Sequence, residues 1–410
     1  MHPAETLALD KAAFASIQPR CPYVGACGGC TLQDLRYEDQ LALKQTRLQR
    51  ILGPLTPAAG LPIIAAPTPW RYRNKAELTF GTTEGRVTLG YHAPRSFWRI
   101  VDIDDCLLLP EAICCILRDV EQLAQESGLP AYHVRTHQGF FRYLVIRSST
   151  ASNQVAICLI TTAGDRRPIE QMTQALMQRH PALHSVYWGV SSRLADAAQP
   201  EELFLIRGAP WLDDRIGPFQ VQLGPLSFLQ PNTDQAARAY EQVMHWVGAD
   251  KHDVAWDLYC GIGLISLYLA TTCGRVYGIE CEERNVELAR RNAQANHLVN
   301  LQFHLGKTED VLARKRFWLL EAKPDVVVVD PPRAGLHERV IAALLAVRPE
   351  SIVYVSCNAQ TLARDIRSLM RGFPRYRLAE AVAFDFFPQT PHVEVLTRLE
   401  RISRSDGSSG

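Results

Sequence analysis

The sequence predicts an α/β protein: a doubly wound, mostly parallel sheet in the C-terminal half, preceded by a mostly antiparallel β region. Two observations carry this prediction. From residue 254 onward, short apolar runs alternate with helix-like segments, as in strands joined by crossover helices. Before that point, several runs alternate apolar and polar residues between Gly- and Ser-rich gaps, which is typical of antiparallel strands. A chain of 410 residues is long enough for two such domains.

The C-terminal strands are expected where apolar residues follow one another without interruption. The clearest run is Pro324-Asp-Val-Val-Val-Val-Asp330, which is typical of a strand buried on both faces. The expected strands are 254–259, 275–280, 301–304, 324–330 and 351–356, and the expected helices are 264–270, 284–296, 338–347 and 359–370. Residues 379–387 and 393–399 predict a final hairpin, which makes one strand of the sheet antiparallel.

The N-terminal half has a different pattern. Alternating strands are expected at 70–80, 86–91, 140–147 and 154–161, and an amphipathic helix at 34–52 that is a candidate to pack on the C-terminal domain. A boundary near 218–225 gives a β-rich domain over 1–220 and a second domain over 221–402. The small polar tail, 403–410, is expected to be disordered.

The composition excludes some functions. Hydrophobic residues make up 47% and charged residues 21% of the chain, and no apolar run approaches the ~20 residues that span a bilayer. No signal peptide is evident at the start, so the protein is expected to be cytoplasmic, with no membrane partner and no evident protein partner. The net charge of +1 gives no global signal for nucleic acid, so any such binding requires local patches. In a reducing compartment, the 11 cysteines favour metal or catalytic roles over disulfides.

A glycine-containing turn predicts a nucleotide-type pocket. Asp257-Leu-Tyr-Cys-Gly-Ile-Gly263 joins an expected strand to a helix, and Glu280 ends the next strand, where an acid can accept hydrogen bonds from ribose hydroxyls. The third glycine of a dinucleotide motif is replaced by Ser266, so S-adenosylmethionine is favoured over NAD. A simple tight turn is the alternative.

Asp330-Pro-Pro follows the strongest strand. The two prolines stiffen the loop, and Asp330 is expected at the carboxyl edge of the sheet, where it could accept a hydrogen bond from a base or an amino group. A helix N-cap is the alternative role for Asp330.

Cys357 ends the strand that begins at Ser351, which makes it a candidate nucleophile, although free cysteine is as often a core residue. Glu394 begins the last expected strand. Because that strand is antiparallel, its start lies at the edge where the parallel strands end, beside Gly261, Glu280, Asp330 and Cys357. A thiol and a carboxylate beside a methyl-donor pocket suggest methylation of uracil at carbon 5. A thiolate adds to carbon 6, and a base later removes the carbon 5 proton.

Several motifs occur together in the order found in one family. They are Phe228-Leu-Gln-Pro-Asn232, Asp257 to Gly263, Asp330-Pro-Pro-Arg-Ala-Gly335, Tyr354 to Asp365, and Phe387-Pro-Gln-Thr-Pro-His-Val-Glu394. From about Cys21 to Leu399, the chain resembles the RNA uracil-5-methyltransferases, which make 5-methyluridine in 23S rRNA and tRNA. The resemblance implies a class I S-adenosylmethionine-dependent methyltransferase domain.

The resemblance also implies roles for individual residues. Cys357 would be the nucleophile and Glu394 the base that removes the carbon 5 proton. The contacts to S-adenosylmethionine would come from Gln230, Tyr259, Glu280 and Asp330. Tyr259 stands where many members have Phe, a change that keeps the aromatic ring. An amino-group methyltransferase is a rival reading of Asp330-Pro-Pro, but it leaves Cys357 and Glu394 without a function.

Four cysteines predict a second centre. Cys21, Cys27 and Cys30 lie within ten residues, and Cys106 is the best candidate for a distant fourth ligand. Three neighbouring thiols and one distant thiol suit a 4Fe–4S cluster better than a zinc site, which usually pairs two knuckles. The rRNA enzymes of the family share this spacing, so a structural 4Fe–4S cluster is expected, with zinc as the alternative.

The RNA contacts are expected on the antiparallel sheet. Candidates are Arg71-Tyr-Arg-Asn-Lys75, Arg135, His137, Arg142 and Arg147, although a solvated strand face is the alternative. Only 20 residues precede Cys21, too few for the small N-terminal barrel of many relatives. The resemblance makes 23S rRNA the expected substrate and tRNA the second.

Overall fold

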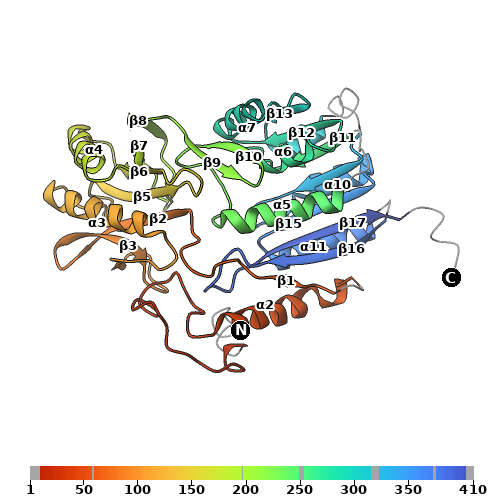
Figure 1. Cartoon of the computed structure of the whole chain (residues 1–410), viewed down its shortest axis with the longest axis horizontal. Helices are drawn as coiled ribbons and strands as arrows, with labels where there is room; N and C mark the ends of the chain where they lie inside the picture. Colours follow the sequence, from red (N-terminus) through yellow and green to blue (C-terminus); the bar gives the residue numbers. More distant parts are fainter. Residues whose placement is uncertain are drawn as a thin grey trace.

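The computed structural model (Figure 1) describes residues 10–57, 60–195, 197–248, 254–314, 323–372 and 375–402. The disorder expected for 403–410 concerns residues outside these ranges. Two large sheets lie side by side, and the C-terminal one holds the predicted catalytic residues. Among the described residues, no helix has the length and apolar character needed to cross a membrane.

The C-terminal sheet has eight strands in the order β1-β16-β17-β15-β14-β11-β12-β13. Its strands are β1 (Ile63–Ile64), β11 (Val254–Leu258), β12 (Arg275–Glu280), β13 (Leu301–Leu305), β14 (Val326–Val329), β15 (Ser351–Ser356), β16 (Tyr376–Phe384) and β17 (Glu394–Arg401). Only β17 runs antiparallel to its neighbours β15 and β16. The predicted doubly wound sheet with a terminal hairpin is confirmed, and the hairpin places Glu394 at the edge where the parallel strands end.

Helices cover both faces of this sheet. One face packs against α5 (Thr233–Val247), α6 (Leu264–Leu269) and α7 (Glu283–Ala295). The other packs against α2 (Tyr37–Leu52), α8 (Thr308–Ala313), α10 (Glu338–Val347) and α11 (Ala359–Arg371). On β14, Val326 and Val328 join the first core, whereas Val327 and Val329 join the second. Burial on both faces explains the unbroken valine run.

The N-terminal sheet has seven strands in the order β4-β3-β2-β5-β6-β7-β8. They are β2 (Lys75–Thr83), β3 (Arg86–His92), β4 (Ile100–Asp102), β5 (Phe141–Ser148), β6 (Val155–Thr161), β7 (Leu183–Val190) and β8 (Glu202–Gly208). All pairs are antiparallel except β6 with β7. The parallel pair is bridged by α4 (Arg167–Arg179), which packs with α3 (Glu111–Glu126) on one face.

Two segments from the N-terminal part of the chain belong to the C-terminal core. Helix α2 packs against α11 through Leu48 and Leu52, and β1 adds to the edge of the C-terminal sheet beside β16. The hairpin of β9 (Leu212–Ile216) and β10 (Phe219–Leu223) also buries its apolar residues in that core. The two halves of the chain are therefore interlocked, and the C-terminal core includes residues from Leu212 onward as well as α2 and β1.

Candidate active site

The predicted catalytic and cofactor residues line one cavity of about 1430 Å³ at the carboxyl edge of the C-terminal sheet. Tyr259, Glu280, Asp330 and Cys357 follow or end the parallel strands β11, β12, β14 and β15, and Glu394 begins β17. Gln230 lines the same cavity from the segment before α5. All six residues therefore converge, as the predicted topology requires.

The turn after β11 leaves open space for a ligand. Gly261 has a φ of +55°, and a Cβ at this position would have no atom within 4 Å. Its N–H donates to the Glu280 carboxylate at 3.0 Å. Glu280 also accepts the N–H groups of Cys281 and Glu282, each at 2.8 Å. These three bonds fix the carboxylate and leave acceptor capacity for a ribose hydroxyl.

Two carboxylates, Asp257 and Asp330, lie close to this turn. The Asp257 carboxylate is fully buried and accepts a hydrogen bond of 2.6 Å from Ser266, the residue found where a dinucleotide motif has glycine. Burial raises the pKa of both carboxyl groups to about 7. Asp330 does not cap the next helix, because α10 begins at Glu338 and is capped by His337. Asp330 is thus available to a ligand at the cavity wall.

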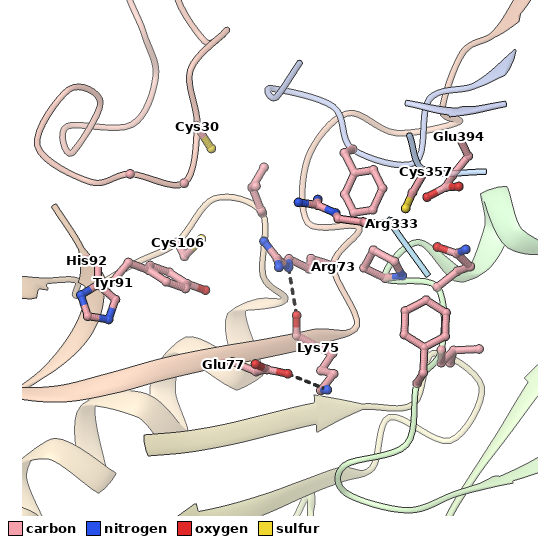
Figure 2. A pocket seen from close by; sticks show the side chains of 18 of the residues that line it. Cys30, Arg73, Lys75, Glu77, Tyr91, His92, Cys106, Arg333, Cys357 and Glu394 are labelled. Carbon is pink, nitrogen blue, oxygen red and sulfur yellow. Dashed lines mark hydrogen bonds and ion pairs between the residues drawn. The ribbon is translucent and has the colours of Figure 1, made fainter. Parts of the chain in front are cut away.

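Cys357 is half-buried and faces the cavity, so it is not a packed core residue. Burial and the nearby Glu394 carboxylate raise the pKa of its thiol, while Arg333 opposes that rise. Asn358, which caps α11 through its side chain, donates to the Arg333 carbonyl at 3.1 Å. Thr361 donates to the same carbonyl at 3.3 Å. The start of α11 therefore fixes Arg333 beside the thiol (Figure 2).

The sequence interpretation did not give Arg333 a role. The available signal was a cation in the Pro-Pro-Arg segment, directly after the predicted cofactor residue Asp330. Only the folded chain shows that α11 brings this cation to the strand end that carries Cys357.

Glu394 is 2% exposed and lies beside Cys357 in Figure 2. Burial and the Asp330 carboxylate raise its pKa, and Arg333 opposes the rise. Its Oε2 atom has no hydrogen-bond partner among the described residues. A buried carboxylate oxygen without a partner is costly unless a ligand or substrate completes the site.

The N-terminal half holds Gln230 in place. Asn74, at the entry to β2, donates its side-chain amide to the Gln230 carbonyl at 2.9 Å and to the Thr233 hydroxyl at 3.0 Å. The Asn74 N–H donates to the Pro231 carbonyl at 2.8 Å. The cavity is therefore built by both halves of the chain.

The four predicted cluster ligands, Cys21, Cys27, Cys30 and Cys106, line the other end of this cavity. Burial raises the pKa of the Cys30 thiol to about 12, and the other three cysteines add to the rise. The partly buried guanidinium of Arg73 lies close to Cys106 and Cys30 (Figure 2). Four thiols beside a cation are a donor set suited to an anionic cluster.

Within the described ranges, however, no three His, Cys, Asp or Glu side chains have the spacing of ligands to a metal ion. The 4Fe–4S cluster is therefore proposed only on the chemistry of the four thiols and on their place at one cavity.

Several residues predicted to contact RNA are buried, which corrects that prediction. Arg142 is 2% and Arg147 0% exposed, and their guanidinium groups donate to the Ser191 and Ser227 carbonyls. Tyr72 and Asn74 are also buried, and Arg71 is paired with Asp105 at 2.7 Å. Every residue of β5 is buried, so its arginines do not reach a solvated face.

An aromatic surface, defined here as Phe97, Trp98 and Arg135, lies at the cysteine end of the cavity. The two rings are 55% and 50% exposed and pack edge to face with centroids 4.9 Å apart. The Arg135 guanidinium lies 4.4 Å from the centre of the Trp98 ring. Arg135 was predicted to contact RNA, but the two rings were missed because they fall in a short loop without periodicity.

Comparisons with known proteins find RNA methyltransferases. Residues 219–402 match the family model for tRNA (uracil-5-)-methyltransferase. A protein of Nitratidesulfovibrio vulgaris described as an uncharacterized RNA methyltransferase is 36% identical over 404 residues, covering 97% of this chain and 85% of its own. A similarly described protein of Halalkalibacterium halodurans is 34% identical, with 94% and 83% covered.

A solved structure extends the likeness to the fold. The Pyrococcus abyssi tRNA (uracil-54, C5)-methyltransferase, in complex with S-adenosyl-L-homocysteine, has a TM-score of 0.75 and 30% sequence identity, covering 91% of this chain and 84% of its own. The fold and the site define an S-adenosylmethionine-dependent RNA methyltransferase. More particularly, the chain belongs to the RNA uracil-5-methyltransferase family.

Proposed function

We propose that this enzyme methylates carbon 5 of a uridine in RNA through a covalent bond between Cys357 and carbon 6 of the base. The observation that carries the proposal is the arrangement of the cavity. The Cys357 thiol, the buried Glu394 carboxylate and the turn in which Gly261 bonds Glu280 line the same cavity.

The proposed reaction begins with the Cys357 thiolate, whose sulfur lone pair forms a bond to carbon 6 of uracil. The electrons of the carbon 5–carbon 6 double bond move toward the carbonyl at carbon 4 and make carbon 5 nucleophilic. Arg333 favours the thiolate, because its positive charge lowers the cost of the anion. When bound, S-adenosylmethionine would supply the methyl group, which carbon 5 takes as the sulfur–methyl bond of the donor breaks to leave S-adenosylhomocysteine. Gln230, Tyr259, Glu280 and Asp330 would hold the donor.

Glu394 then acts as the base. Its carboxylate takes the proton from carbon 5, the double bond re-forms, and the carbon 6–sulfur bond breaks to release Cys357. Because burial raises the pKa of Glu394, its ionised form is a stronger base than an exposed carboxylate.

The proposed RNA partner enters from the side of the aromatic surface. Phe97 lines the cavity, and Phe228, which is 62% exposed, lines it near Gln230. Exposed rings stack on unpaired bases, and the target uridine must leave its stack to reach Cys357. A single-stranded loop is therefore the proposed substrate. The four-cysteine pattern favours 23S rRNA, and tRNA is the second candidate, because the Pyrococcus abyssi enzyme is named for tRNA.

The test is a methylation assay on unmodified 23S rRNA and tRNA transcripts, followed by mass-spectrometric mapping of 5-methyluridine. Wild-type enzyme should modify one uridine, and Cys357→Ala should modify none. Full activity in Cys357→Ala would exclude the covalent mechanism. If only the tRNA transcript is methylated, tRNA replaces 23S rRNA as the proposed substrate.

A further inference from the structure

Gln389 joins its own loop to three other segments that are distant in the sequence. It lies in the loop between β16 and β17, five residues before Glu394, and is 2% exposed. Its carbonyl accepts hydrogen bonds from the N–H groups of Thr31 at 3.1 Å and Leu32 at 3.0 Å. These two residues directly follow Cys30, one of the proposed cluster ligands.

The remaining polar groups of Gln389 are also engaged. Its N–H donates to the Gln40 side-chain oxygen at 2.9 Å, and its own side-chain oxygen accepts from the Gln40 amide at 2.9 Å. Its Nε2 donates to the Pro69 carbonyl at 3.4 Å. Helix α2, the segment after Cys30 and the segment before β2 that contains Pro69 thus meet at one residue.

The backbone of Gln389 is strained. Its φ of +70° lies in the left-handed region, which a residue other than glycine occupies only when the surroundings enforce it. The dense hydrogen bonding supplies that enforcement. Such outliers are often found where a functional group must be held in one place.

Glu394 begins β17 directly after this loop, and its backbone pairs with Phe384 at the end of β16. One of its carboxylate oxygens has no hydrogen-bond partner in the described residues, so the placement of the backbone at this end of the strand directs the group toward the cavity. The far end of the same hairpin is anchored separately, where Tyr376 donates to the Pro349 carbonyl at 2.8 Å.

We propose that Gln389 is a positioning residue that fixes the base Glu394 by tying its loop to helix α2 through its side chain and to the segment that follows Cys30 through its carbonyl. This inference rests on the function proposed above. It deepens that function, because it makes the cysteine-bearing segment part of the support of the base.

The test separates proton removal from the earlier steps. Enzyme, an unmodified RNA transcript that the wild type methylates, and radiolabelled S-adenosylmethionine are mixed, and labelled covalent protein–RNA adduct is quantified on a denaturing gel. Gln389→Gly removes the side chain and relaxes the backbone, so Glu394 should lose its position after methyl transfer. The labelled adduct should rise about tenfold or more over wild type, since a small misplacement of a catalytic group costs up to about a hundredfold.

Further variants keep the result interpretable. Gln40→Leu, which removes the partner of Gln389, should show the same accumulation. Gln389→Asn, which keeps an amide and tolerates the left-handed region, should fall between Gln389→Gly and wild type. Tyr376→Phe removes a buried hydrogen bond from the far end of the hairpin and should behave like wild type.

The inference is overturned if Gln389→Gly and Gln40→Leu release product at the wild-type rate, or if Tyr376→Phe accumulates as much adduct as they do. Glu394→Gln in the same experiment distinguishes a failure of the proposed role of Gln389 from a failure of the proposed function. If Glu394→Gln traps adduct and the glutamine variants do not, only the role of Gln389 fails. If Glu394→Gln traps none, the proposed function fails.

Discussion

The Lys44 ammonium lies 2.6 Å from the Asp385 carboxylate, and both side chains are fully buried. Asp385 also accepts the Tyr37 hydroxyl at 2.9 Å, so two residues of α2 hold the first residue after β16. Lys44 donates in addition to the Phe387 carbonyl at 3.1 Å. The loop that leads to Glu394 is thus attached to an N-terminal helix by charge as well as by packing.

Lys44→Met should lower the free energy of unfolding by about 3 to 5 kcal/mol, because it leaves the Asp385 carboxylate buried without its counter-ion. Urea unfolding measures this difference. Arg50→Met is the control, because Arg50 is half exposed in its ion pair with Asp10 and such pairs contribute about 0 to 1 kcal/mol. Equal effects of the two variants would contradict the importance of the buried pair.

Arg333→Gln should move the pH dependence of kcat/KM. The guanidinium lowers the pKa of the Cys357 thiol, so its removal lets that pKa rise. The acid limb of the profile, where the thiolate forms, should then shift to higher pH by about one unit. Arg339→Gln serves as the control, because Arg339 pairs with Asp310 on the surface. An unchanged profile in Arg333→Gln would mean that Arg333 does not stabilise the thiolate.

Trp98→Ala should weaken RNA binding about 5- to 100-fold, because a stacked base contributes about 1 to 3 kcal/mol. Filter binding with an unmodified 23S rRNA fragment measures the Kd. Trp98→Phe should retain most of the affinity. Phe204→Ala removes another exposed ring, 36% accessible on β8, which lies outside the aromatic surface. A loss as large in Phe204→Ala as in Trp98→Ala would show that the aromatic surface has no special role.

The proposed 4Fe–4S cluster predicts a brown protein after anaerobic purification, with about four iron atoms per chain. Cys106→Ala should lose the colour and the iron. Cys115→Ala should keep both, because Cys115 is exposed on α3 and does not line the cavity. A colourless wild-type protein that holds one zinc ion would refute the cluster and support the zinc alternative.

The C-terminal sheet was predictable because its apolar residues form runs that are typical of strands buried on both faces. Strands buried on both faces leave runs such as Val326 to Val329, and a terminal hairpin leaves two prolines between two apolar runs. These sequence features alone predict that Cys357 and Glu394 lie at the same edge of the sheet. Helix α4 and strands β7 and β8 were not predicted. Strand β8 has the apolar run Leu203 to Ile206 but is mostly exposed, so it lacks the alternation of a half-buried strand.

The RNA surface was less predictable for a physical reason. A cation in a strand looks the same whether its face is solvated or covered, and Arg147 is covered on β5 by the segment that contains Ser227. Arg333 is a similar case, since its role depends on how α11 packs. Long-range contacts of this kind have no local sequence signal.

Trapping the covalent intermediate shows whether Cys357 and Glu394 act on the same uracil. Glu394→Gln is incubated with S-adenosylmethionine and an unmodified transcript of the RNA that the wild type methylates. The mixture is digested and searched by mass spectrometry for a peptide linked to a nucleotide. A methylated uridine bonded to Cys357 is expected, and none is expected when Glu394→Gln is combined with Cys357→Ala. Normal release of 5-methyluridine by Glu394→Gln, or a link to another residue, would contradict this expectation.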